Sequence, residues 1–155
     1  ARLTGEVVVV GIVNYHAFQV AEHRNPVDDT KLNRAYPGES GGSSSERIAH
    51  ETFEIASEAD LVVDATGHEA VICRALHRRR AIPKLEANTF AGEDGMDAAE
   101  AEKFVVEHTQ EVFPGLWVGG MAVCSLYGGP RMGPIFGGML SSGRKVAQQI
   151  ANALT

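Results

Sequence analysis

The chain has 155 residues, of which 44% are hydrophobic and 22% charged, and its formal net charge at pH 7 is −6. This is the length of one domain, and the composition is that of a folded globular protein and excludes a disordered one. Proteins that bind the nucleic-acid backbone present a clustered basic face, and a membrane span needs about 20 consecutive apolar residues, so the sequence favours neither partner.

Four features are predicted in the first part of the chain. Residues 7–13 are almost all β-branched, which is typical of a buried strand. Residues 25–45 are polar and rich in turn-forming residues, so we expect a loop without regular structure there. A helix is predicted to start at residues 43–46, where serine can cap the helix and an acid favours its first turn. Residues 61–65 are expected to form a second buried strand.

The second part of the chain alternates helices and strands. We expect a short amphipathic helix over residues 70–80, an irregular segment over residues 82–97, and a last helix that opens at the glycine-rich residues 128–134. Three short strands are predicted, over residues 104–109, 111–115 and 116–118. The last helix carries one apolar stripe, formed by Val146, Ile150 and Leu154. The alternation predicts a single α/β domain over residues 1–155, with a mainly parallel, Rossmann-like sheet between helices in three layers.

The first candidate site follows the strand predicted at residues 61–65. Polar residues at the carboxyl end of a buried strand mark the place where ligands dock in open α/β sheets. His68 would lie at the start of the next helix, where its imidazole could face a ligand or bind a metal. The alternative is a polar residue at a helix start without any partner.

The second candidate is the glycine-rich segment of residues 128–138. Its small residues would let a ligand approach the backbone, and the amides at the start of the last helix would attract an anion. Arg131 adds a cation whose planar fork suits a carboxylate or a phosphate. The alternative is that the glycines serve tight packing, since the segment is neither a dinucleotide fingerprint nor a P-loop.

Other residues give weaker signals. Asn33 and Arg34 in the long loop could bind a carboxylate. The alternative is that they belong to a solvated loop. Cys124 lies in an apolar run and is expected to be a small core residue. Three further histidines do not have the spacing of a zinc site: His16, His23 and His50.

From about residue 60 to residue 155 the chain resembles the C-terminal part of the sulfide-dependent thiazole synthase family, which makes the thiazole of thiamine. The stretches that carry the resemblance are residues 62–70, 102–109, 114–123 and 130–140, the last of which reads Pro-Arg-Met-Gly-Pro-Ile-Phe-Gly-Gly-Met-Leu. The resemblance implies an NAD-derived adenylate and Fe(II) as cofactors, with His68 helping to hold the iron. It also implies a cofactor-binding segment that cradles the glycine-derived part of an adenylated intermediate, made of Arg131, Met132, Gly133, Gly137 and Gly138. The dinucleotide-binding unit of that family is not found in the sequence, so we expect an incomplete NAD site.

Residues 1–64 resemble a different family, the zinc-dependent succinylglutamate desuccinylases and aspartoacylases. The matching stretches are residues 25–28, 32–38 and 45–49. Asn33 and Arg34 match the pair that binds the substrate carboxylate there. The His and Glu zinc ligands of that family are missing, and its third ligand is replaced by Thr66, so zinc and metal-assisted hydrolysis are not expected.

The two resemblances meet near residues 60–66, which suggests a chimera joined at a strand that both families could supply. Residues 14–18 also resemble the thiazole synthase segment that precedes an iron-binding Asp. On that alignment the acid is replaced by Asn25, and Asp28 or Asp29 could substitute for it.

These observations leave three functional interpretations open. The first is an inactive or vestigial module that is stabilised by self-association into a homo-oligomer. The second is a thiazole-synthase-like module that binds an adenylate or a metal through His68 and Arg131, and the third is a carboxylate binder that uses Asn33 and Arg34. If the chain is an enzyme, we expect a thiazole-synthase-like transferase rather than a zinc hydrolase. We expect a cytoplasmic protein with a small-molecule ligand and without a nucleic-acid or membrane partner.

Overall fold

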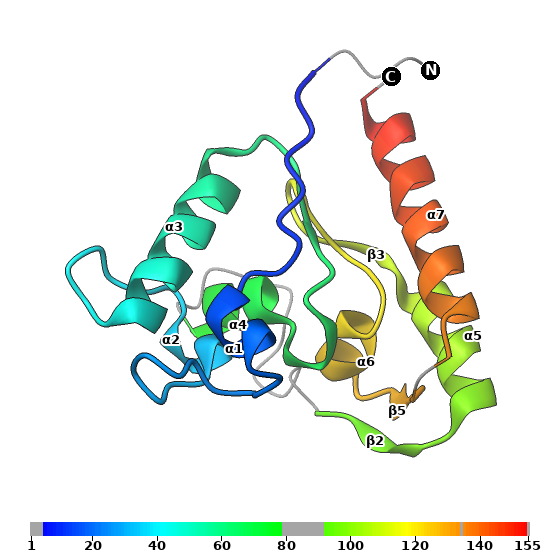
Figure 1. Ribbon diagram of the computed structural model, residues 1–155. Coiled ribbons are helices and arrows are strands. Elements are labelled where there is room, and N and C mark those ends of the chain that lie inside the picture. Colours follow the sequence, from blue (N-terminus) through cyan, green and yellow to red (C-terminus); the bar gives the residue numbers. More distant parts are fainter. Residues whose placement is uncertain (1–4, 79–91, 134, 155) are drawn as a thin grey trace. The chain divides into compact units, whose positions relative to one another are not determined.

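The computed structural model describes residues 5–78, 92–133 and 135–154. The chain divides into two compact units, residues 1–59 and residues 60–155 (Figure 1). A single domain over residues 1–155 stays a prediction.

The described residues 5–59 of the first unit form the helices α1 (Tyr15–Gln19), α2 (Leu32–Ala35) and α3 (Ser44–Glu58). The start predicted for α3 is confirmed, and its cause is a capping box. The Ser43 hydroxyl accepts a hydrogen bond from the Glu46 amide at 3.4 Å, and the Glu46 carboxylate accepts one from the Ser43 amide at 2.7 Å. Both amides would otherwise lack a partner at the helix end, which is why this sequence pattern favours a helix start.

The long loop before α3 is also confirmed, except that the short helix α2 interrupts it. Asn25 is fully buried and ties the loop to the start of α3. Its amide nitrogen donates to the hydroxyls of Ser44 at 3.2 Å and Ser45 at 3.1 Å, and its amide oxygen accepts from the Val27 N–H at 3.0 Å. A buried amide with these partners is a structural element of the loop.

The buried strand predicted over residues 7–13 is wrong. The segment contains no assigned strand, and its apolar side chains are exposed, with Val9 at 84%. A β-branched run favours extended backbone, but a strand also needs a neighbour that pairs with its N–H and C=O groups. Among the described residues no strand pairs with this segment.

The second unit alternates strands and helices, as an α/β fold requires. Its elements are β1 (Val62–Asp64), the 3-10 helix η1 (Gly67–Glu69), α4 (Val71–Arg78), β2 (Asp94–Met96), α5 (Ala98–His108), β3 (Gln110–Phe113), β4 (Leu116–Val118), α6 (Ala122–Tyr127), β5 (Pro130–Arg131) and α7 (Gly137–Ala153). One sheet has the order β1-β4-β3, in which β1 and β4 are parallel and β3 and β4 antiparallel. In a second small sheet β2 pairs with β5 in parallel (Figure 1). The α/β class predicted from the sequence is therefore confirmed.

Strand β2 lies within residues 82–97, which were expected to be irregular and of which only residues 92–97 are described. Two further predictions for this unit are wrong, and the first concerns helix α5. Residues 104–109 were expected to be a strand, but residues 98–108 form a helix. Asp97 caps it by accepting a hydrogen bond from the Glu100 amide at 3.1 Å, and Ala101 and Val105 form its buried face. The adjacent valines at 105 and 106 favour a strand by local propensity. The buried residues Ala101 and Val105 are four positions apart, which is the spacing of one face of a helix.

Helix α7 is the second correction, because it begins at Gly137 and not within residues 128–134. That earlier segment instead ends α6, a helix that the sequence did not predict, and forms β5. The apolar stripe predicted on α7 is confirmed only in part. Val146 is buried, whereas Leu154 near the end of the helix is 59% exposed. No helix in the described part of the chain is long and apolar enough to cross a membrane.

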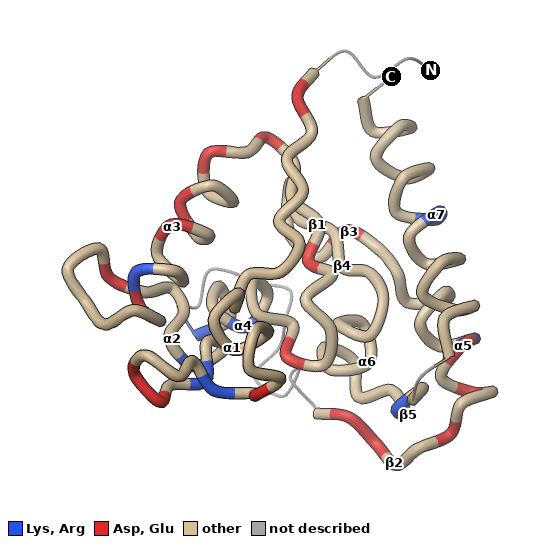
Figure 2. The backbone as a smooth tube through the Cα atoms, viewed as in Figure 1, with Lys and Arg blue, Asp and Glu red and all other residues tan. Residues whose placement is uncertain are grey.

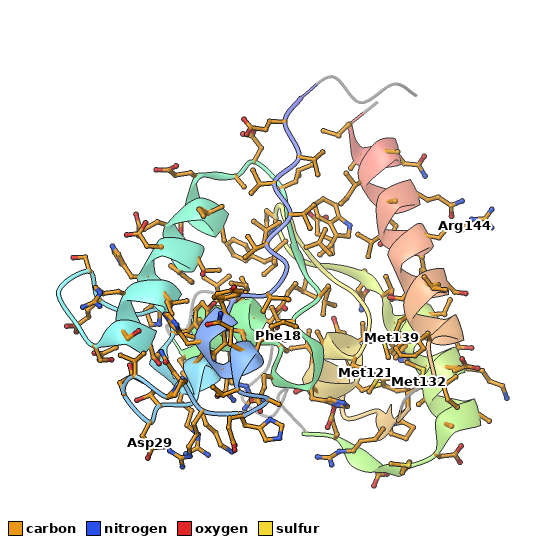
Figure 3. All side chains as sticks on the ribbon, in the orientation of Figure 1. Phe18, Asp29, Met121, Met132, Met139 and Arg144 are labelled. Atoms are coloured by element: carbon orange, nitrogen blue, oxygen red, sulfur yellow. The ribbon has the colours of Figure 1, made fainter. Side chains whose placement is uncertain are left out.

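The core of the second unit lies where α5, α6, β5 and α7 meet. Its buried members are Ala101, Val105, Met121, Cys124 and Met132, with Phe104 and Met139 packed against them. Figure 3 shows the side chains of Met121, Met132 and Met139 close together. Fully burying a methionine contributes roughly 1.5–3 kcal/mol, so this cluster anchors the glycine-rich segment to the rest of the unit.

Candidate functional site

The turn after β1 is shaped by the buried carboxylate of Asp64. This carboxylate accepts hydrogen bonds from the Thr66 amide at 3.1 Å, the Thr66 hydroxyl at 2.7 Å and the Cys73 amide at 2.8 Å. Burial, followed by the charge of Asp64, raises the pKa of the Cys73 thiol, so this cysteine stays protonated and inert. The turn leaves the side chain of His68 half-exposed on η1.

His68 and Arg131 meet on the same carboxylate, that of Glu93. One oxygen of Glu93, Oε1, contacts His68 Nδ1, and the other, Oε2, accepts a hydrogen bond from Arg131 Nε at 2.8 Å. His68 follows β1, Glu93 directly precedes β2, and Arg131 is on β5, the strand that pairs with β2 (Figure 2). Two residues that the sequence singled out in separate motifs therefore belong to one site.

Glu93 was missed by the sequence analysis because a single acid in an irregular segment carries no signal of its own. Its side chain is only 5% exposed, whereas those of His68 and Arg131 are 51% and 59% exposed. The site is thus a buried carboxylate beneath two accessible side chains. Its charge offsets that of Arg131, so the pair is close to neutral.

The accessible atoms of this site are those that Glu93 does not engage. Within the described part of the chain, neither His68 Nε2 nor the two Nη groups of Arg131 have a hydrogen-bond partner. A guanidinium with a free Nη edge binds a carboxylate or a phosphate through two parallel hydrogen bonds. The site can therefore bind an anionic group and contact it with one imidazole nitrogen.

Met132 and Gly133 follow Arg131 and have different roles. The Met132 side chain is fully buried in the core, so a ligand could meet this residue only through its backbone. Gly133 has a φ of +66°, a left-handed conformation that glycine adopts at little cost. The turn after Arg131 thus depends on a buried anchor and on a residue without a side chain.

Gly137 and Gly138, which the resemblance placed in the cofactor-binding segment, serve packing between α5 and α7. A Cβ at Gly138 would lie 2.9 Å from the Glu102 Cα, closer than real Cβ atoms come to backbone. The Glu102 carboxylate also accepts a hydrogen bond from the Gly138 N–H at 3.0 Å. The start of α7, where we expected an anion site, is therefore already capped by a carboxylate of the same unit. Both glycines also line an open hollow of about 530 Å³ between the two helices.

The candidates in the first unit are engaged in local structure or lack partners. Asn33 and Arg34 lie on α2, and neither side chain bonds to a residue in the described ranges. Burial raises the pKa of Asp28, but hydrogen bonds from Ser45 and Thr30 outweigh it and hold this pKa below its usual value. Asp29 pairs with Arg24 at 3.5 Å. Carboxylate binding by Asn33 and Arg34 stays a prediction.

The donors near His68 do not by themselves fit an iron ion. Non-haem Fe(II) sites commonly combine two histidines with one carboxylate. Among the described residues, no group of three or more His, Cys, Asp and Glu side chains lies close enough to hold a metal. In the described part of the chain, the carboxylate beside His68 is that of Glu93, whose charge is already paired with Arg131. A metal role for His68 stays a prediction.

Comparison with known proteins relates the chain to enzymes of thiamine biosynthesis. Thiamine thiazole synthase of Thermotoga maritima is 54% identical over 108 residues, which cover 70% of this chain and 41% of that protein. The enzyme of the same name from Thermococcus kodakarensis is 53% identical over 97 residues, or 63% of this chain and 37% of that protein. This chain thus spans about two fifths of the length of these relatives.

A solved structure supports the fold. The crystal structure of Thermovibrio ammonificans THI4 matches with a TM-score of 0.56 and 47% sequence identity, over 62% of this chain and 36% of that one. The likeness is consistent with the Rossmann-like α/β class predicted from the sequence.

A family match covers both units. Residues 5–136 match the Thi4 family, and this span includes residues 5–64 and the expected junction at residues 60–66. The thiazole synthase resemblance is confirmed, whereas these findings give no support to a deacylase-like segment or to a chimera. Since the match covers most of its length, the chain belongs to the Thi4 family.

Proposed function

We propose that residues 60–155 bind a carboxylate-bearing adenylate and act as part of a synthase that forms the thiazole of thiamine. The observation that carries this proposal is the meeting of His68 and Arg131 on the buried carboxylate of Glu93. The names of the relatives support the thiazole product. The adenylate is the ligand that the family resemblance implies.

In this proposal each residue has a defined task. The Nη edge of Arg131 binds the ligand carboxylate, because a planar fork matches its two oxygens. His68 Nε2 contacts a polar hydrogen of the same ligand. Met132 holds the turn in the core, and Gly133 lets the ligand approach the backbone. The side chains in the described part of the chain do not provide a set of donors that fits an iron ion.

Arg131→Ala tests the proposal, with Arg144→Ala as its matched control. Arg144 is an exposed arginine of the same unit and projects away from α7 in Figure 3. Calorimetry would compare two probes that differ in one group, NAD with its amide and nicotinic acid adenine dinucleotide with a carboxylate. A hydrogen bond to a charged group contributes about 1.5–3 kcal/mol, so we expect the wild type to bind the carboxylate form at least about tenfold more tightly.

Arg131→Ala should abolish that preference, and Arg144→Ala should keep it. Equal binding of both probes by the wild type, or an unchanged preference in Arg131→Ala, would remove Arg131 from the proposed site.

The homo-oligomer expected from the sequence also stays a proposal. What supports it is exposed apolar surface near the start of α7, where Phe136 is 65% and Leu140 75% exposed.

A further inference from the structure

We propose that Glu93 is a positioning residue, which sets the nitrogen of His68 that carries the proton and the edge of Arg131 that a ligand meets. This inference rests on the proposed function for the identity of the ligand. The proton position on His68 and the orientation of Arg131 are properties of the ligand-free protein.

The chemistry of the contact with Glu93 determines which nitrogen of the His68 imidazole carries the proton. An ionised carboxylate can only accept hydrogen bonds, and a neutral imidazole has one N–H donor and one acceptor nitrogen. Glu93 Oε1 contacts His68 Nδ1, so the proton must lie on Nδ1. The other nitrogen, Nε2, then carries the lone pair, on a side chain that is 51% exposed.

The contact with Glu93 also determines which edge of the Arg131 guanidinium is left for a ligand. Arg131 donates to Glu93 through Nε at 2.8 Å, which uses the side of the guanidinium that includes this nitrogen. The edge formed by the two Nη groups is left for a ligand. A ligand therefore meets an acceptor nitrogen from His68 and a pair of N–H donors from Arg131.

Glu93 is held in this position by its backbone and by its burial. The Asp94 N–H donates to the Gly129 carbonyl at 3.1 Å and the Asp97 N–H donates to the Arg131 carbonyl at 3.2 Å, which fixes β2 beside β5. Burial, and then the nearby Glu93 charge, raises the pKa of the Cys124 thiol to about 11. The Glu93 side chain is only 5% exposed, so the carboxylate lies at the edge of the core.

Glu93→Gln should reverse the proton position on His68. The glutamine carbonyl is the one acceptor left, and Arg131 Nε, which can only donate, requires it. The glutamine NH₂ group must then face His68 Nδ1, which becomes an acceptor, and the proton moves to Nε2. The substitution keeps the size of the side chain, so it tests hydrogen-bond direction rather than packing.

The experiment is a long-range ¹H–¹⁵N correlation spectrum of the histidines in the ligand-free protein. It is recorded at pH about 8.5, well above the usual imidazole pKa of about 6.5. We expect a protonated Nδ1 on His68 in the wild type and a protonated Nε2 in Glu93→Gln. His108 is an internal control in both proteins, because its Nδ1 faces the Phe104 carbonyl at 3.0 Å and should keep its proton.

A wild-type His68 with its proton on Nε2, or with an even mixture of both forms, would overturn the inference whatever the variant does. The wild-type spectrum therefore tests the inference even if Glu93→Gln fails to fold. A changed His108 signal in the variant would reveal such a failure. A second readout links the residue to the ligand. Glu93→Gln and Glu93→Ala both remove the charge, but only glutamine keeps an acceptor for Arg131 Nε. The preference for the carboxylate probe should therefore be weaker in Glu93→Ala than in Glu93→Gln, and equal preferences in the two variants would refute the positioning of Arg131.

The two proposals fail in different ways. If the wild type binds neither dinucleotide but His68 carries its proton on Nδ1, the proposed function fails and the structural part of this inference stands. If the carboxylate preference depends on Arg131 while the proton lies on Nε2, the proposed function stands and the role of Glu93 is refuted.

Discussion

Gly138 and Gly143 on α7 form a matched pair that tests whether glycine in this helix is required by packing. A Cβ at Gly138 would lie 2.9 Å from the Glu102 Cα and 3.1 Å from the Met132 Sδ, whereas nothing lies within 4 Å of a Cβ at Gly143. Glycine in a helix interior is about 1 kcal/mol less favourable than alanine. Overpacking against a rigid backbone typically costs about 1–3 kcal/mol.

Gly143→Ala should therefore raise the free energy of unfolding by roughly 0.5–1 kcal/mol. Gly138 lies in the first turn of α7, so Gly138→Ala gains at most the same helix contribution, and because it also clashes with α5 its free energy of unfolding should fall by about 1 kcal/mol or more. The difference between the two variants therefore contains the packing cost of ~1–3 kcal/mol and at most about 1 kcal/mol from helix propensity.

Urea unfolding followed by tryptophan fluorescence measures this difference. Trp117 is the one tryptophan of the chain and is buried on β4, so its emission reports on the unit that contains α7. If both alanine variants are stabilised to the same extent, the close approach of α5 and α7 at Gly138 is refuted. Gly138 would then be free to serve a ligand, as the family resemblance implies.

Two further predictions concern the core and the acid at the start of α3. Met132→Ala should lower the free energy of unfolding by about 2–5 kcal/mol because its side chain is fully buried, whereas Met132→Leu should cost less than about 1.5 kcal/mol; equal urea midpoints for both would contradict its place in the core. The pKa of Asp28 is lowered in the folded protein from its ordinary value of 3.8, so its carboxylate stabilises the fold above that value and the contribution is lost as the pH falls below it. The stability difference between wild type and Asp28→Asn should accordingly shrink between pH about 6 and pH about 3, and a difference that is constant with pH would refute the hydrogen bonds to Ser45 and Thr30.

Elements that depend on neighbouring residues could be predicted from the sequence. The start of α3 follows from Ser43 and Glu46, which satisfy each other's amides within one helical turn. Strands β1 and β4 follow from short apolar runs that end in polar or glycine residues. The local motifs around His68 and Arg131 also identified these two residues as candidate site residues.

The errors share one physical cause, since burial and strand pairing depend on residues distant in the sequence. The run at residues 7–13 has strand propensity but no pairing partner in the described part of the chain. Residues 104–108 include two adjacent valines but form a helix, because Val105 packs in the core with Met121 and Met132. Local propensity is a weak guide where such contacts decide the conformation.

The sequence by itself determined the α/β class, the capped start of α3 and, for residues 60–155, the thiazole synthase family, and it singled out His68 and Arg131 as candidates. The tertiary structure alone decided that Glu93 joins His68 to Arg131 and that Glu102 caps the start of α7. Each of these carboxylates acts on groups far from it in the chain, and only the pairing of β2 with β5 and the packing of α5 on α7 bring them together. A single acid carries no signature of a partner that folding places beside it.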